Sequence, residues 1–211
     1  MKNLKNIDWW EKVLEDTPAS YKYWFEKEKI FLRENITEDS KVLEIGCGEG
    51  RSLSYILDIT KNIVGIDNNI KAVEDAKINL GKVDIRLADG IDLPFEDNSF
   101  DFVICMTTPA NFGKEKQKFY SEMKRVMKQE GQILLSVFNE DALDERLKLY
   151  EKVGAKIRKN NNGKIIFEED ILDNVSEQFS KKELEEIFNE AGLKIIEIKK
   201  EGLGYFCSLR K

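Results

Sequence analysis

The chain has 211 residues, of which 41% are hydrophobic and 35% are charged, and its formal net charge is −6. This is the length of one globular domain with room for a small cap, and no apolar stretch is long enough to cross a bilayer, so no membrane partner is expected. The acidic balance disfavours a nucleic-acid partner, because phosphate neutralisation needs a basic face.

Residues 1–40 are predicted to form a helical cap ahead of the main fold. They hold all three tryptophans, and their apolar residues follow helical spacing first around Trp10, Val13 and Leu14 and then from Tyr23 to Phe31. The stretch lacks the apolar core of a signal peptide, which predicts a cytoplasmic protein. We expect most of these aromatic rings to pack on the core and one or two to line a substrate pocket.

From residue 41, short apolar runs alternate with helical patterns, which predicts an α/β fold with a doubly wound parallel sheet. Right-handed crossovers between the strands then place helices on both faces of the sheet. The expected strands are 42–45, 62–66, 83–88, 100–106 and 132–138, and the expected helices are 51–58, 70–80 and 114–128.

The pattern changes after residue 139, where we expect a helix at 141–153, a hairpin about Asn160 to Gly163 and a short strand within 175–179. Ser180 and Glu183 predict a capping box at the start of a helix that ends at Gly192. Strands at 193–199 and 205–209 should then pair antiparallel at one edge of the sheet. We therefore expect a cap at 1–40 and a main domain at 41–211, with a cap insertion at about 140–179.

The glycine-rich turn after the first strand is the strongest functional signal. Its spacing is G-x-G-x-G, from Gly46 to Gly50, whereas the dinucleotide fingerprint would need its last glycine where Arg51 stands. Glu44 ends the preceding strand, and a carboxylate there would repel a pyrophosphate. It suits the ammonium and sulfonium cations of S-adenosylmethionine, which carries no phosphate.

Two further acidic residues follow the neighbouring strands. Asp67 comes directly after the second strand, where a carboxylate can accept both ribose hydroxyls, and Asp89 follows the third, where it can accept from the adenine amino group. Gly90 can offer its backbone N–H to the adenine ring. Each acid alone is most often a solvated loop residue, and their placement at adjacent strand ends is what favours a cofactor site.

These segments resemble the motifs of the class I S-adenosylmethionine-dependent methyltransferases. Residues 42–50 resemble the first motif, 64–67 the second and 88–103 the third and fourth. The stretch from Leu93 to Asp101 is typical of the subgroup that contains ubiquinone/menaquinone-biosynthesis-like and many small-molecule enzymes. The resemblance implies a Rossmann-like sheet of seven strands with the last strand antiparallel.

The resemblance also implies which residues bind the cofactor and what the protein does. It implies methyl transfer by in-line displacement to a small-molecule acceptor, with S-adenosylhomocysteine as the product. Residues 107–112 lack the Asn/Asp-Pro-Pro-aromatic motif of enzymes that methylate amino groups of nucleic-acid bases. The implied cofactor-binding residues are Glu44, Gly46, Cys47 and Gly48 beside the methionine and ribose, Asp67 and Asn68 at the ribose, Asp89 and Gly90 at the adenine, and Met106 below the sulfonium.

The chain has no histidine, which excludes Ser-His and Cys-His nucleophiles, and its three cysteines form no C-x-x-C pair, so no metal is expected. The sequence assigns no catalytic residue. Tyr21, Tyr23 and Tyr205 are candidates for a base, and packing would also explain each. The alternatives are a protein methyltransferase, a non-catalytic cofactor-binding protein and a nicotinamide dehydrogenase, the last disfavoured by Glu44 and Arg51.

Overall fold

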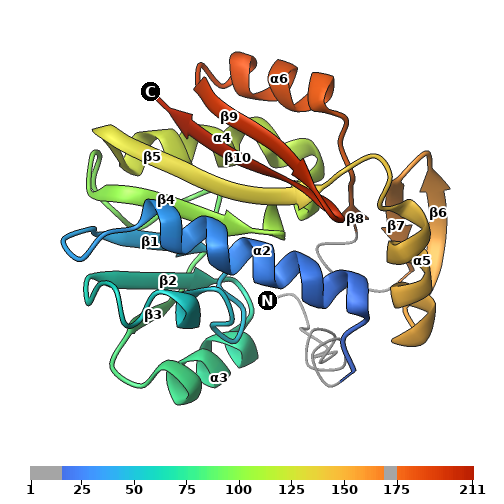
Figure 1. Ribbon diagram of the computed structural model, residues 1–211, viewed down its shortest axis with the longest axis horizontal. Coiled ribbons are helices and arrows are strands. Elements are labelled where there is room, and N and C mark those ends of the chain that lie inside the picture. The colour runs from blue at the N-terminus through green and yellow to red at the C-terminus, as the bar shows by residue number, and fades with distance from the viewer. Residues whose placement is uncertain (1–15, 169–174) are drawn as a thin grey trace.

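Seven strands form one twisted sheet in the order β3-β2-β1-β4-β5-β10-β9 (Figure 1). The computed structural model describes residues 16–168 and 175–211, so the helix expected about Trp10 lies outside the described residues. β10 runs antiparallel to both of its neighbours, β5 and β9, whereas the other pairings are parallel. The predicted doubly wound sheet with its closing hairpin is confirmed. The strands are β1 (Val42–Ile45), β2 (Ile63–Asp67), β3 (Asp84–Leu87), β4 (Phe100–Met106), β5 (Met127–Phe138), β9 (Lys194–Glu201) and β10 (Gly204–Arg210).

Helices cover both faces of the sheet, as the side chains of β4 show, because they point alternately to one face and to the other. Val103 and Cys105 are buried in a cluster with α4 (Lys116–Val126) and α6 (Lys181–Glu190). Ile104 and Met106 point the other way, into a cluster with α2 (Ala19–Asn35) and α3 (Ile70–Leu80). Because successive strand residues face opposite sides, a strand that is apolar throughout requires cover on both faces.

The expected helix at 51–58 is wrong, because the structure has only the 3₁₀ turn η1 (Leu53–Tyr55) within this stretch, flanked by irregular turns. Side chains compete with the backbone here, since Ser54 Oγ donates to the Arg51 carbonyl at 2.6 Å and Ser52 donates to the Glu44 carboxylate. Backbone bonds from Tyr55 to Ser52 and from Ile56 to Leu53 then close the tighter turns.

The strand expected at 132–138 is longer in the structure. α4 ends at Val126 and β5 begins at once with Met127, which pairs with Phe100 before the register shifts, so that Phe102 pairs with Gln132. This register shift sets residues 128–131 of β5 against Asp101 alone and interrupts the ladder there. Two 3₁₀ turns, η2 (Thr108–Asn111) and η3 (Gly113–Glu115), lie between β4 and α4.

A small second sheet stands beside α5 (Leu143–Lys152) at one end of the molecule (Figure 1). It contains β6 (Ile157–Asn161), β7 (Lys164–Phe167) and β8 (Val175–Ser176). The predicted hairpin turns at Asn162 and Gly163, whose φ angles of 47° and 91° are both positive, as a tight turn between right-twisted strands needs. Tyr21 and Trp24 of α2 share a buried cluster with Tyr150 and Phe167, so this unit packs against the N-terminal helix.

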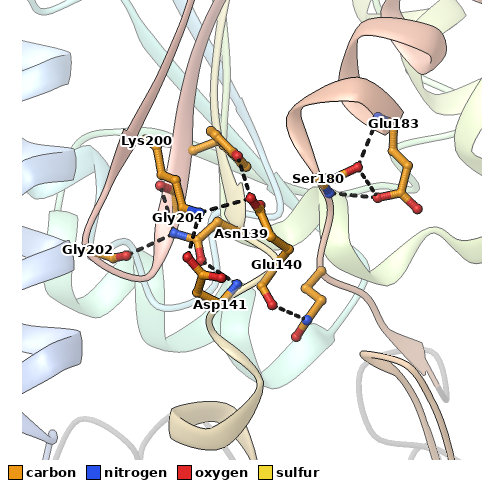
Figure 2. Close-up of polar contacts among 10 residues, drawn as sticks. Asn139, Glu140, Asp141, Ser180, Glu183, Lys200, Gly202 and Gly204 are labelled. Atoms are coloured by element: carbon orange, nitrogen blue, oxygen red, sulfur yellow. Dashed lines mark hydrogen bonds and ion pairs between the residues drawn. The ribbon is translucent and has the colours of Figure 1, made fainter.

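The carboxyl end of β5 is tied to the β9–β10 hairpin (Figure 2), and residues 139–141 lead from it toward α5. Asn139 Nδ2 donates to the Gly202 carbonyl at 2.9 Å.

The predicted capping box is present at the start of α6, because the Ser180 hydroxyl accepts from the Glu183 backbone and the Glu183 carboxylate accepts from the Ser180 N–H. No helix within residues 16–168 and 175–211 has the length and apolarity that a bilayer span requires.

Candidate cofactor site

A partly open pocket lies where the carboxyl ends of β1 and β4 meet, and its empty space, with the solvent at its mouth, is about 480 Å³. One wall is the glycine-rich loop and the other is the segment that follows β4. In open α/β sheets, ligands bind at this edge, beyond the carboxyl ends of the strands. The lining residues are Gly46, Cys47, Gly48, Glu49, Arg51 and Ser52 from the first wall and Met106, Thr107, Thr108 and Asn111 from the second.

The glycines of the loop are required by backbone conformation and by close approach. Gly46 and Gly48 have φ angles of 73° and 54°, in the left-handed region that favours glycine. A Cβ on Gly46 would collide with the Thr108 side chain, whose hydroxyl donates to the Gly46 carbonyl at 3.2 Å. A Cβ on Gly48 would meet open space, so the loop presents bare backbone at that point.

Asp67 connects the glycine-rich loop to the end of β2. Its Oδ2 accepts a hydrogen bond from the Gly48 backbone N–H at 2.9 Å, and its Oδ1 accepts from the Asn69 N–H at 2.9 Å. Asp67 Oδ2 therefore ties the end of β2 to the glycine-rich loop. The predicted residues Gly46, Cys47, Gly48 and Met106 line the pocket, and Asp67 lies next to it.

Glu44 lies one layer behind the pocket and does not line it. Its side chain is fully buried, its Oε1 accepts from the Ser52 hydroxyl, and its Oε2 has no hydrogen-bond partner among the described residues. Burial raises the pKa of the Glu44 carboxyl to about 8, although the Ser52 hydrogen bond and the nearby Arg51 charge oppose this rise. Ser52 separates this carboxyl from the pocket.

Three predicted residues stand away from the pocket at the ends of β2 and β3. Asn68 is exposed, and its neighbour Asn69 caps α3 by accepting from two backbone N–H groups. Asp89 is exposed and accepts from the Ile91 N–H at 3.1 Å. Gly90 is buried, and a Cβ there would press on Ile45 and on the ring of Phe112.

The three tyrosines considered as bases do not line the pocket. Tyr21 is buried in the aromatic cluster of α2. Tyr23 donates to Glu201 at 2.8 Å, and Tyr205 donates to Glu140 at 3.1 Å. Packing and surface contacts account for all three.

Sequence reasoning missed Glu28, a fully buried carboxylate on α2 beside the pocket wall. It accepts hydrogen bonds from Ser136 and from Thr107 and pairs with Arg51 at 2.7 Å. The sequence did contain a signal for a buried Glu28, because this residue lies at four-residue spacing between Trp24 and Leu32. In the structure all three side chains are fully buried. A charged residue in the apolar stripe of a helix needs a buried partner.

Comparison with known proteins decides the family. A family model described as a methyltransferase domain matches residues 36–192, which is well over half of the chain. The chain belongs to this methyltransferase family. One curated relative of the chain is a probable S-adenosylmethionine-dependent methyltransferase of Mycolicibacterium smegmatis, 30% identical over 123 residues. The match covers 57% of this chain and 48% of that protein, so it spans about half of the relative's length.

Solved structures share the fold of the methyltransferase over most of its length. A Pyrococcus horikoshii protein superposes with a TM-score of 0.71 at 21% identity, covering 92% of both chains. The Burkholderia thailandensis 1,6-didemethyltoxoflavin-N1-methyltransferase superposes with a TM-score of 0.67 at 16% identity, covering 95% of this chain and 81% of the other. That structure contains S-adenosylhomocysteine and 1,6-didemethyltoxoflavin. At these identities the likeness establishes the fold.

Proposed function

We propose that this methyltransferase uses S-adenosylmethionine to methylate a small-molecule acceptor. The observation that carries the proposal is the pocket between the glycine-rich loop and the segment after β4, with Asp67 held against one of its walls. Family membership, a relative named for the same cofactor and a structural neighbour that binds S-adenosylhomocysteine support this proposal.

The residues present fit this cofactor on their own chemistry. The bare backbone at Gly48 leaves room for a ligand, and the buried Glu44 oxygen without a partner leaves a negative field behind the loop when ionised. Above the Glu44 pKa of about 8, this charge would repel a phosphate and attract the ammonium and sulfonium of S-adenosylmethionine, and the bound cations would in turn favour the ionised carboxylate. We assign Gly46, Cys47, Gly48 and Met106 to the methionine side, with Glu44 acting through Ser52.

The remaining predicted residues extend the proposed site along the strand ends. Asp67 would accept from the ribose hydroxyls, with Asn68 beside it. Asp89 and Gly90 would hold the adenine at the end of β3. S-adenosylmethionine supplies an activated methyl group when bound, so the protein needs mainly to orient the acceptor and to exclude water. Thr107, Thr108 and Asn111 lie on the wall that the acceptor would face.

The helices and strands that pack beside the pocket support a small-molecule acceptor. α2 packs against the α5 and β6–β8 unit, and Ala110, which precedes the pocket residue Asn111, lies in the same buried cluster. The 1,6-didemethyltoxoflavin-N1-methyltransferase, which shares this fold, binds 1,6-didemethyltoxoflavin. A cap beside the pocket favours a metabolite as the acceptor over a protein, which would need an open groove.

Radiolabelled methyl transfer into a fractionated cell extract tests the proposal. The protein is incubated with S-[methyl-³H]adenosylmethionine and extract, and label is expected in the fraction below about 1 kDa. Label in the protein fraction would overturn the small-molecule acceptor. Calorimetric titration with S-adenosylhomocysteine and with NADH tests the cofactor separately, and binding of NADH alone would overturn the cofactor assignment.

A further inference from the structure

The pocket has one cationic side chain among the described residues that line it, and this is Arg51. The amino-acid end of S-adenosylmethionine is a zwitterion, so a site for it must satisfy a carboxylate as well as an ammonium. Arg51 follows the glycine-rich loop directly, beside the wall assigned to the methionine. Its side chain keeps 19% of its surface exposed, so it is accessible from the pocket.

The Arg51 guanidinium is held firmly on one side. It lies over the ring of Phe25 with its central carbon 4.0 Å from the ring centroid. Its Nη1 donates to Tyr55 Oη at 3.1 Å and pairs with Glu28 Oε2 at 2.7 Å. Its Nε and Nη2 make no hydrogen bond to residues 16–168 or 175–211. A guanidinium carries donors on a planar fork, so one edge stays free for a second carboxylate.

Glu28 is the group that fixes this arrangement. Its carboxylate is fully buried on α2 and accepts from the hydroxyls of Ser136 on β5 and Thr107 after β4, the latter at 3.3 Å. Two hydroxyls therefore donate to Oε1 of this carboxylate, while Oε2 forms the ion pair with Arg51. Thr107 has a φ angle of 71°, which a residue other than glycine rarely adopts, so the wall opposite the glycine-rich loop is held in an unusual conformation beside Glu28.

Stability alone does not account for this pair. Removing two charges from water carries a penalty that their attraction often fails to repay, and apolar residues of the same size are commonly as stable. The Glu28–Arg51 ion pair, together with the Thr107 hydrogen bond to Glu28, joins α2 to both walls of the pocket. It thus couples the cap to the place where the amino-acid end of the cofactor would lie.

We infer that Arg51 binds the carboxylate of the cofactor's amino-acid group and that Glu28 is the positioning residue that orients Arg51. This inference rests on the proposed function and extends it with a subsite for one defined group. Nε and Nη2 of Arg51 donate to the ligand carboxylate while Glu28 keeps Nη1. The cap helix thereby takes part in cofactor binding without contacting the cofactor.

Calorimetric titration with two ligands tests the inference. One ligand is S-adenosylhomocysteine, and the other is its decarboxylated analogue, which keeps the adenosine, the sulfur and the amine. The wild-type protein should bind the first roughly 10- to 100-fold more tightly, as expected for charge-assisted hydrogen bonds. Arg51→Met should remove this difference by weakening S-adenosylhomocysteine alone, and Arg51→Lys should restore part of it.

Glu28→Gln tests the positioning role, because it keeps the shape of the side chain and removes its charge. It should reduce the ratio of the two affinities while leaving the affinity for the decarboxylated ligand within about threefold. The inference would be overturned if Arg51→Met weakened the binding of both ligands equally, or if the wild-type protein bound both with equal affinity. Either result would leave the proposed function standing. If the wild-type protein bound neither ligand, the proposed function would fall first. The comparison of the two ligands on the wild-type protein tests the inference even if a variant fails to fold.

Discussion

The Ser52 hydroxyl donates a hydrogen bond to the carboxyl group of Glu44, which joins the glycine-rich loop to a fully buried position in β1. This contact places a titratable group behind the wall of the pocket. It also explains why the stretch after the loop does not begin a regular helix, since Ser52 is committed to a side-chain contact.

Glu44 should make the stability of the protein depend on pH. Burial raises its pKa from 4.5 to about 8, so the folded state binds a proton that the unfolded state has released between these values. Stability from this group is present below about pH 4.5 and is lost as the pH rises toward 8. Relative to wild type, Glu44→Gln should gain up to about 1 kcal/mol per pH unit across this window.

Urea unfolding of the ligand-free protein at pH 5, 6.5 and 8 measures this effect, with Ser54→Ala as a control on the same exposed turn. Parallel pH profiles for wild type and Glu44→Gln would show that Glu44 titrates in its ordinary range.

Asp67→Ala should weaken binding of S-adenosylhomocysteine by about 10- to 100-fold. The substitution removes the acceptor for the Gly48 and Asn69 N–H groups and the proposed acceptor for the ribose hydroxyls. Calorimetric titration measures the affinity. Glu74→Ala, an exposed change on α3, is the matched control and should bind as wild type does. Unchanged affinity in Asp67→Ala would remove this residue from the site.

Ser180→Ala should lower the free energy of unfolding by about 1 kcal/mol, because it removes the side-chain cap of α6 (Figure 2). Affinity for S-adenosylhomocysteine should not change, since Ser180 does not line the pocket. Lys182→Ala, in the first turn of the same helix with a largely exposed side chain, is the control for helix propensity. Equal stability of the two variants in urea would argue against the cap.

Arg146→Met should destabilise the protein by about 3 kcal/mol or more. The fully buried guanidinium donates to the Gly163 carbonyl at 3.0 Å and to the Ser176 carbonyl at 2.9 Å, and its loss leaves both acceptors without these bonds. The strands β7 and β8 should then exchange their amide hydrogens faster than β1 and β4. Hydrogen exchange followed by mass spectrometry checks this, and uniform protection would contradict it.

Local patterns were sufficient for most of the fold. The nearly apolar run Phe100–Met106 predicts a central strand, because both of its faces must be covered. Ser180 with Glu183 predicts a helix start, because the two side chains satisfy free backbone groups. The helix expected at 51–58 failed because Ser52 is engaged by Glu44, a partner eight residues away that periodicity does not represent.

The sequence by itself determined the order of strands and helices, the glycine-rich loop and the acidic residues at the strand ends, because each follows from spacing along the chain. Only the tertiary structure decided that Glu44 lies behind the pocket, that Tyr21 packs away from it and that Glu28 reaches Arg51. Glu28 and Arg51 lie on different elements, so their pairing depends on how α2 packs on the sheet. Desolvation, which sets the pKa of Glu44, likewise depends on the whole surroundings of a group and not on its neighbours in sequence.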